Sequence, residues 1–390
     1  MMLVSVSIKN FRNFDDWFEF DLKTTKNYEF NEHAVANGVV KHAMIYGQNG
    51  GGKSNLGLAV LDITCHLNDM ASNSALAGLY SNYLNANSCE ALAEFKYCFK
   101  FDGIDVTYLY GKKDVNTVVY ERLEVNGKAY IELDRRISSV AVFELKGTEN
   151  LKRDLSGSTI SALKYVNANA ILEDSVEGKA FKCLMSFVKG MVFFRTLSKR
   201  SEHHGVEVEI KRISKEIIDA GYLKDFEDFL NESGVECHLA ESGPKGDERI
   251  DFVFDGRNVE FSLAASSGTQ SLGIFYFWWL KLKQGELTFA YIDEFDAFYH
   301  HALAKKVVKR LSSLSCQTIL TTHNTSIMSN DLLRPDCYFE VKGNVSFRNK
   351  GVITDKSGEK PGMYPFFSLV NKELRKAHNL EKIYKGLVNG

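Results

Sequence analysis

The alternation of apolar and polar residues changes along the chain, and each pattern predicts a different kind of element. Residues 3–8 alternate in character and predict a strand, and the aromatic residues at 17–20 suggest a second, short one. The apolar run at 43–46 stops abruptly at a glycine, which is typical of a buried strand that leads into a loop. Residues 55–67 carry apolar side chains on one side of a predicted helix.

A period of two dominates residues 93–135. Alternating runs lie on both sides of the dipeptide Asp102-Gly103, and a second pair of runs is joined through Asn126-Gly127. Such dipeptides are strong signals for tight hairpin turns, because both central residues of these turns adopt positive φ. This region therefore predicts an antiparallel sheet.

The middle of the chain has a different pattern. Residues 140–235 are mostly helical in pattern, with a polar stretch at 198–205 that suggests a loop. The helical spacings at 211–230 continue for too short a distance to form a long coiled-coil arm. Two short strands are expected at 250–254 and 259–263.

The last third of the chain alternates between helices and strands. Helices are expected at 270–283 and 302–313, and strands at 289–292 and 317–321. This alternation favours a parallel sheet covered by helices. We therefore expect an α/β fold with a mixed sheet, flanking helices and a separate antiparallel region.

Composition narrows the class of protein further. The 390 residues have 44% hydrophobic content and a formal net charge of −2, which argues against binding to nucleic acid through bulk charge alone. The seven cysteines form no CxxC pair and are interpreted as reduced thiols of a cytoplasmic protein. The N-terminus lacks the pattern of a signal peptide, and no apolar stretch is long enough to span a membrane.

Residues 47–54 match the phosphate-binding pattern GxxxxGK[ST] at every fixed position, between an apolar strand and a helix. The glycines let backbone N–H groups surround a phosphate chain, and the helix N-terminus adds positive potential. Lys53 is expected to reach the β- and γ-phosphates, and the Ser54 hydroxyl to coordinate Mg²⁺. The predicted nucleotide-binding residues of this loop are Gly47, Gln48, Asn49, Gly50, Gly51, Gly52, Lys53, Ser54 and Asn55.

Two later strands end in residues suited to the other half of such a site. The apolar strand at 289–292 is followed by Asp293, a candidate for the magnesium shell, and by Glu294, a candidate general base for an attacking water. The strand at 317–321 is followed shortly by His323, which could bind the γ-phosphate or orient that water. A solvated turn and a structural histidine are the alternatives, and the phosphate-binding loop favours the catalytic interpretation.

Small hydroxyl residues and a glycine open the helix expected at 270–283. Ser266, Ser267 and Gly268 form a good helix cap and a potential anion site. They are either only a cap or a motif that grips a γ-phosphate bound by another subunit.

The phosphate-binding loop, the serine-glycine segment, the acidic pair and the histidine occur in the order found in ABC-type ATPases. The chain resembles the SMC and RecF group through NFRNF at 10–14 and GQNGGGKSN at 47–55. More narrowly, it resembles OLD-like predicted ATPases of bacterial abortive-infection and phage-defence loci, including the PtuA-like ATPase subunit of Septu systems. Supporting matches are IDEFD at 292–296, TTHN at 321–324, LRPD at 333–336 and the tail at 374–384.

The resemblance implies a role for each matching residue. Lys53 and Ser54 would bind phosphate and Mg²⁺, Asp293 would bind Mg²⁺, Glu294 would be the base, and His323 would be the switch residue. It further implies that Ser267 and Gly268 act on the nucleotide of a second copy, that Asp296 lies in a loop at the dimer interface, and that Arg12 lies near the nucleotide.

The sequence also departs from the family pattern. Thr269 replaces the glycine of many ABC signatures, and no persuasive Q-loop glutamine lies between the phosphate-binding loop and the signature. No TOPRIM-like nuclease segment follows the ATPase core, so cutting of nucleic acid would need a partner. The resemblance suggests an N-terminal ATPase lobe at 1–139, a helical insertion lobe at 140–250, and a C-terminal ATPase lobe at 251–390.

The expected function is that of a cytoplasmic ATPase that dimerises around ATP and Mg²⁺, as the sensor of an anti-phage complex with a separately encoded nuclease or toxin. One alternative is a DNA-binding repair ATPase of the RecF or SMC type, and another is a scaffold stabilised by ATP with little turnover. A membrane partner is not expected. The candidate DNA contacts are Lys189, Arg195, Lys199, Arg200, Lys211 and Arg212.

Overall fold

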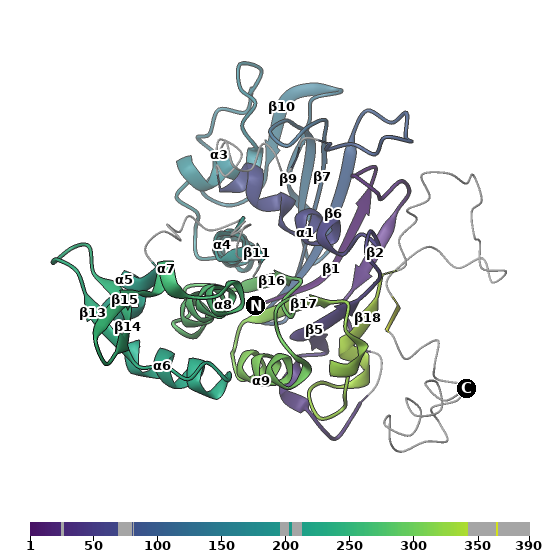
Figure 1. Ribbon diagram of the computed structural model, residues 1–390. Helices are drawn as coiled ribbons and strands as arrows, with labels where there is room; N and C mark the ends of the chain where they lie inside the picture. The colour runs from purple at the N-terminus through teal and green to yellow at the C-terminus, as the bar shows by residue number, and fades with distance from the viewer. Residues whose placement is uncertain are drawn as a thin grey trace, which may run out of the picture.

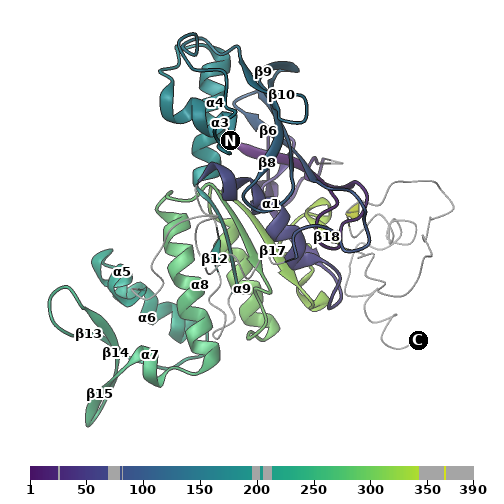
Figure 2. The ribbon, with the colours of Figure 1, turned by 90° about the horizontal axis from the view of Figure 1, so that it is seen from above.

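The computed structural model describes residues 1–24, 27–68, 80, 82–195 and 213–341, together with the backbone of two short strands at 203–204 and 364–365. Two seven-stranded sheets organise these residues, one antiparallel and one mainly parallel. The antiparallel sheet and the helix-covered parallel sheet lie next to each other, and a smaller three-stranded sheet projects on the side of α5, α6 and α7 (Figures 1 and 2).

The antiparallel sheet has the strand order β10-β9-β8-β7-β6-β1-β2. Its strands are β1 (Met2–Lys9), β2 (Phe18–Asp21), β6 (Ala93–Phe101), β7 (Ile104–Lys112), β8 (Val118–Val125), β9 (Lys128–Asp134) and β10 (Ser138–Phe143). Both predicted hairpin turns are present. Asp102 and Gly103 have φ of 50° and 87°, and Asn126 and Gly127 have φ of 48° and 78°. These positive values are the reason that Asn, Asp and Gly occupy the turns.

The second sheet has the order β12-β11-β16-β17-β5-β18-β19. Its strands are β5 (His42–Tyr46), β11 (Met191–Arg195), β12 (His203–His204), β16 (Phe289–Asp293), β17 (Gln317–Thr322), β18 (Tyr338–Glu340) and β19 (Tyr364–Pro365). The five central strands are parallel, and the edge strands β12 and β19 are antiparallel. The carboxyl ends of the central strands therefore meet at one edge, where parallel sheets carry their ligands.

Helices cover both faces of this sheet. Phe193 and Phe194 on β11 point to opposite faces, as successive residues of a strand do. On one face, α1 (Lys53–Leu67) approaches so closely that a Cβ added to Gly57 would lie 2.7 Å from the Phe193 ring. On the other face, the indole of Trp278 on α8 (Ser267–Lys283) stacks on Phe194 with ring centroids 5.1 Å apart. The expected mixed α/β fold with flanking helices is confirmed, and Trp278 is buried in the core.

The remaining elements are shorter. They are η1 (Glu32–Ala34), β3 (Val35–Ala36), β4 (Val39–Val40), α3 (Ala162–Asn169), α4 (Val176–Lys189), α5 (Ile213–Asp219), α6 (Leu223–Glu232), β13 (Leu239–Ser242), β14 (Arg249–Phe254), β15 (Arg257–Glu260), α7 (Phe261–Ala264), α9 (His301–Ser312), η4 (Thr325–Ile327) and η5 (Pro335–Cys337). Across the described ranges, no helix has the length and apolar run needed to cross a membrane.

Three local predictions need correction. The described residues of 140–235 are helical only in part, because β10 extends the antiparallel sheet and β11 is buried within the parallel sheet. A short apolar run such as that of β11 does not distinguish a buried strand from a helix by periodicity. The helical segment predicted at 211–230 is two helices, α5 and α6, separated near Gly221 with φ of 73°. The strand predicted at 259–263 ends at Glu260, and α7 begins at Phe261.

The division of the chain at residues 139 and 250 stays a prediction, although β11 lies within 140–250 and joins the central sheet. The loop predicted at 198–205 and the tail at 374–384 fall outside the described residues, apart from the backbone of β12.

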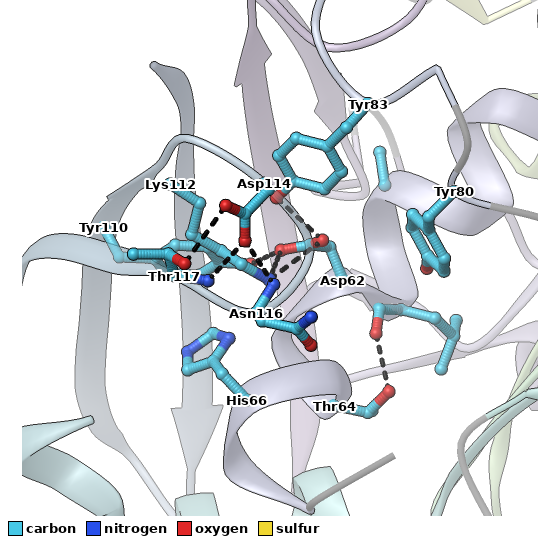
Figure 3. A network of polar contacts seen from close by, with 12 residues as sticks. Asp62, Thr64, His66, Tyr80, Tyr83, Tyr110, Lys112, Asp114, Asn116 and Thr117 are labelled. Carbon is cyan, nitrogen blue, oxygen red and sulfur yellow. Dashed lines mark hydrogen bonds and ion pairs between the residues drawn. The ribbon is translucent and has the colours of Figure 1, made fainter. Parts of the chain in front are cut away.

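A buried polar network joins α1 to the antiparallel sheet (Figure 3). The carboxylate of Asp62 on α1 accepts hydrogen bonds from the Tyr83 and Tyr110 hydroxyls at 2.9 and 2.8 Å. The ammonium of Lys112 on β7 lies 3.0 Å from the same carboxylate, and both charged side chains have 0% exposure. The helix that follows the phosphate-binding loop is thus connected to the antiparallel sheet through a fully buried ion pair.

Candidate functional site

The phosphate-binding loop connects β5, in the centre of the parallel sheet, to α1. Gly50 and Gly52 have φ of 75° and 95°, in the left-handed region that favours glycine. A Cβ added to Gly52 would also lie 2.6 Å from the Asn13 side-chain nitrogen. The Lys53 ammonium donates hydrogen bonds to the backbone carbonyl of Gly47 at 2.7 Å. The structure therefore folds GxxxxGK[ST] into a tight loop that leads directly into the helix N-terminus.

Ser54 and Asp293, the two residues predicted to hold Mg²⁺, lie together. The Ser54 hydroxyl donates to Asp293 Oδ2 at 2.6 Å, and the Thr321 hydroxyl donates to Asp293 Oδ1 at 2.7 Å. Asp293 is fully buried at the end of β16. Adjacent hydroxyl and carboxylate oxygens of this kind suit the hard Mg²⁺ ion, which usually binds one or two protein oxygens together with phosphate and water.

Glu294 and His323 face the same region from the ends of neighbouring strands. Glu294 has φ of 51°, and its backbone N–H donates to the Thr321 hydroxyl at 2.8 Å. His323 Nε2 lies 3.7 Å from Glu294 Oε1, and both His323 ring nitrogens lie 3.2 Å from the Lys53 ammonium. Because Glu294 and His323 remain 33% and 38% exposed, a water molecule and a phosphate group can reach them.

Burial dominates the electrostatics of the loop. Burial lowers the pKa of Lys53, while the nearby carboxylates act in the opposite direction. Burial raises the pKa of Asp296, although the Thr322 hydroxyl donates to its carboxylate at 2.7 Å. The carboxylate of Asp296 therefore bonds within its own chain, whereas the next two residues of that loop, Ala297 and Phe298, are exposed.

The serine-glycine segment lies at the same edge of the sheet as the acidic pair. Ser266 caps α8, because its hydroxyl accepts a hydrogen bond from the backbone N–H of Thr269 at 3.2 Å. A Cβ added to Gly268 would lie 4.0 Å from the Phe298 carbonyl oxygen, in the loop that follows Glu294. Ser267 is exposed. The segment is thus both a true helix cap and accessible to another molecule.

Two arginines approach the loop, and the sequence predicted the position of only one. Arg12 Nη1 donates to the Asn55 side-chain oxygen at 2.7 Å, which places this guanidinium beside the start of α1. Arg195 Nε donates to Asp293 Oδ2 at 2.9 Å. The sequence suggested Arg195 as a DNA contact, but the structure places it against Asp293, in the predicted nucleotide site. Only the pairing of β11 with β16 brings it there.

The other proposed DNA contacts gain no support from the geometry. Lys199, Arg200, Lys211 and Arg212 lie outside the described residues, and Lys189 is the last residue of α4.

The strand-loop-helix arrangement of β5 and α1, with the acidic pair on a neighbouring parallel strand, defines a P-loop nucleoside triphosphatase fold. The family model described as "AAA domain, putative AbiEii toxin, Type IV TA system" matches residues 43–329. The chain belongs to this family, since the match spans well over half of its length.

Comparison with solved structures gives similarity at low sequence identity. The chain is similar to the SMC head domain from Thermotoga maritima, with 15% identity, a TM-score of 0.40, and coverage of 87% of this chain and 94% of that chain. It is also similar to an SMC head bound to the C-winged helix domain of ScpA, with 18% identity, a TM-score of 0.41, and coverage of 85% and 92%. A Pyrococcus furiosus Smc head with an extended coiled coil, bound to the C-terminal domain of ScpA, matches with 17% identity, a TM-score of 0.41, and coverage of 84% and 91%. No curated protein sequence matches the chain.

Proposed function

We propose that this chain is an ATPase that binds ATP with Mg²⁺ between two copies of itself and hydrolyses it. The observation that carries the proposal is the meeting of Lys53, Ser54, Asp293 and Glu294 at one edge of the parallel sheet, although 239 positions separate Ser54 from Asp293. A glycine-rich turn without a ligand would not need an acidic pair and a histidine beside it.

Each residue has a distinct task in this proposal. The backbone N–H groups of the loop and the Lys53 ammonium bind the phosphate chain, which explains why burial of a lysine is tolerated here. Ser54 and Asp293 hold Mg²⁺, and the bound ion would neutralise charge on the phosphate oxygens.

The chemical step requires a base beside the γ-phosphate. Glu294 accepts a proton from the attacking water. The hydrogen bond from its backbone N–H to the Thr321 hydroxyl holds the backbone of Glu294 in position. His323 lies between Glu294 and Lys53 and is placed to orient the water or to bind the γ-phosphate. Loss of such a base typically costs about 10²–10⁴ in rate.

The exposure of the serine-glycine segment supports closure of the site by a second copy. Ser267 is exposed at the N-terminus of α8, where backbone N–H groups attract anions. In a symmetric pair each copy offers Ser267 and Gly268 to the nucleotide that its twin holds on Lys53. The γ-phosphate would then favour the closed pair, because only ATP contacts both copies.

A mixing experiment tests this arrangement directly. Lys53→Ala removes the phosphate contact of a copy but leaves its serine-glycine segment intact, whereas Ser267→Arg blocks that segment but leaves the loop intact. Each variant alone should lose ATP hydrolysis. An equimolar mixture should regain activity, because mixed pairs contain one complete site. Ser138→Arg, at an exposed serine on β10, is the matched control and should behave as the unmodified chain does.

The outcomes separate the parts of the proposal. No recovery on mixing, with hydrolysis retained in Ser267→Arg alone, would refute closure between copies. Hydrolysis retained in Lys53→Ala would refute the nucleotide site itself.

We also propose that this ATPase acts in the cytoplasm as the sensor of a defence complex, where it controls a separately encoded nuclease or toxin. The motifs shared with defence ATPases support this role, and so does the family description, which names a putative toxin of a type IV TA system. The chain should copurify with the product of a neighbouring gene, and Glu294→Gln should change the toxicity of that product in cells. A neighbouring product whose toxicity is the same with Glu294→Gln, Lys53→Ala or no ATPase at all would contradict this role.

A further inference from the structure

Arg195 has an unexpected position at the centre of the nucleotide site. It is the last residue of β11, and the parallel ladder places its Cα opposite that of Asp293 on β16. Its Nε donates to Asp293 Oδ2 at 2.9 Å, and the Ser54 hydroxyl donates to the same oxygen at 2.6 Å. The sheet therefore holds the Arg195 guanidinium against Asp293 Oδ2. The hydroxyl of Ser54, the other residue predicted to bind Mg²⁺, donates to this same oxygen.

This contact is well shielded from solvent. Asp293 has 0% side-chain exposure and Arg195 has 15%. Charges in such surroundings are screened less by water and salt than charges on the surface. A guanidinium stays protonated at all pH values of interest, so its charge remains whether or not a ligand is bound.

Arg195 is one of three cationic side chains around the loop, where carboxylates also act on Lys53. The Lys53 ammonium lies within the loop, and Arg12 contacts Asn55 at the start of α1. Burial lowers the pKa of Arg12, and the positive charge of Arg195 acts in the same direction. The guanidinium of Arg195 on Asp293 would repel a bare divalent cation, and a triphosphate would bring negative charge that offsets this repulsion.

We propose that Arg195 is a positioning residue that holds Asp293 in place and opposes the binding of Mg²⁺ without nucleotide, so that the metal binds together with the triphosphate. This inference rests on the proposed function of the site. The guanidinium competes with a cation for Asp293 Oδ2, and the phosphate oxygens give the guanidinium another partner. The binding of the metal and the binding of the nucleotide are thereby coupled through the side chain of Arg195.

Coupling of this kind can be measured without catalysis. Mn²⁺, as a paramagnetic substitute for Mg²⁺, is titrated into the full chain with and without a non-hydrolysable ATP analogue, and bound metal is measured by electron paramagnetic resonance. By linkage, the factor by which the analogue tightens Mn²⁺ binding equals the factor by which Mn²⁺ tightens analogue binding. Isothermal calorimetry of the analogue with and without Mn²⁺ therefore gives an independent value for the same factor.

Arg195→Ala should bind Mn²⁺ without nucleotide about tenfold more tightly than the unmodified chain, and the coupling factor should fall by about tenfold. Arg195→Lys keeps the charge and should retain most of the coupling, although it lacks the planar donor geometry. Arg249→Ala, at an exposed arginine on β14 outside the site, should leave both quantities unchanged.

Several results would overturn the inference. An unchanged coupling factor in Arg195→Ala, with normal binding of the analogue, would refute it and leave the proposed function intact. Weaker Mn²⁺ binding in Arg195→Ala with or without nucleotide would show that the arginine only supports Asp293. If the unmodified chain binds no analogue at all, both the inference and the proposed function fail.

Discussion

The buried ion pair between α1 and the antiparallel sheet allows a quantitative prediction about stability. Asp62 and Lys112 both have 0% exposure, and Asp62 also accepts bonds from Tyr83 and Tyr110 (Figure 3). Lys112→Met removes the cation but keeps a similar volume. Asp62 then stays buried with two hydroxyl donors and no positive partner, and breaking a buried pair in this way costs about 3–5 kcal/mol.

The partner variants test whether the cost arises from the unpaired charge. Asp62→Asn leaves Lys112 buried without its anion and should be similarly destabilising. The double variant Asp62→Asn/Lys112→Met buries no charge, and the asparagine oxygen can still accept a tyrosine hydroxyl. The double variant should therefore lose less unfolding free energy than the sum of the losses in the two single variants, with a coupling of about 2 kcal/mol. Lys100→Met is the control, since Lys100 and Asp105 are 3.9 Å apart and well exposed, and should cost less than about 1 kcal/mol.

The assay is urea unfolding at pH 7, followed by both tryptophan fluorescence and far-ultraviolet circular dichroism. Coincident transitions from the two probes justify a single free energy of unfolding. A loss below about 1 kcal/mol in Lys112→Met would refute the reasoning, because it would mean that the buried carboxylate needs no cation. A double variant as unstable as the sum of the single variants would also contradict it.

Three further predictions address the active site and the core. Glu294→Gln should lower ATP hydrolysis by about 10²-fold or more while ATP-dependent pairing persists, as measured by light scattering; normal turnover would exclude Glu294 as the base. Gly57→Ala should destabilise the fold by about 1–3 kcal/mol, because a Cβ would lie 2.6 Å from the Tyr291 ring; an unchanged urea midpoint would contradict this close packing. Burial lowers the pKa of His42 from 6.5 to about 3 in the folded state, so the unfolded chain takes up a proton first as pH falls. Between pH 6.5 and about pH 3, stability should therefore fall by about 1.4 kcal/mol per pH unit relative to His42→Asn, and parallel pH profiles would refute this.

Some features of the site and of the fold could be predicted because they depend on residues that are close in sequence. The loop at 47–54 is defined by glycines that tolerate positive φ, followed directly by Lys53 and Ser54. The hairpin turns at Asp102-Gly103 and Asn126-Gly127 follow from the same local preference. A local conformational requirement leaves a local signature in the sequence.

Other features had no such signature. The run of β11 was assigned to a helical region, since a short apolar segment fits either kind of element. Asp62 lies on a helix and its partner Lys112 lies 50 residues away on a strand, and no periodicity relates the two.

The sequence by itself determined the phosphate-binding loop, the acidic pair, the hairpins and the helix-strand alternation, because backbone preference and hydrophobic period act over a few residues. Only the tertiary structure decided that Arg195 meets Asp293, that Asp62 is paired with Lys112, and that Ser267 stays exposed beside the site. Those contacts depend on which strands become neighbours. That choice follows from the packing of the whole core, since the free energy of burying a residue depends on everything that packs around it.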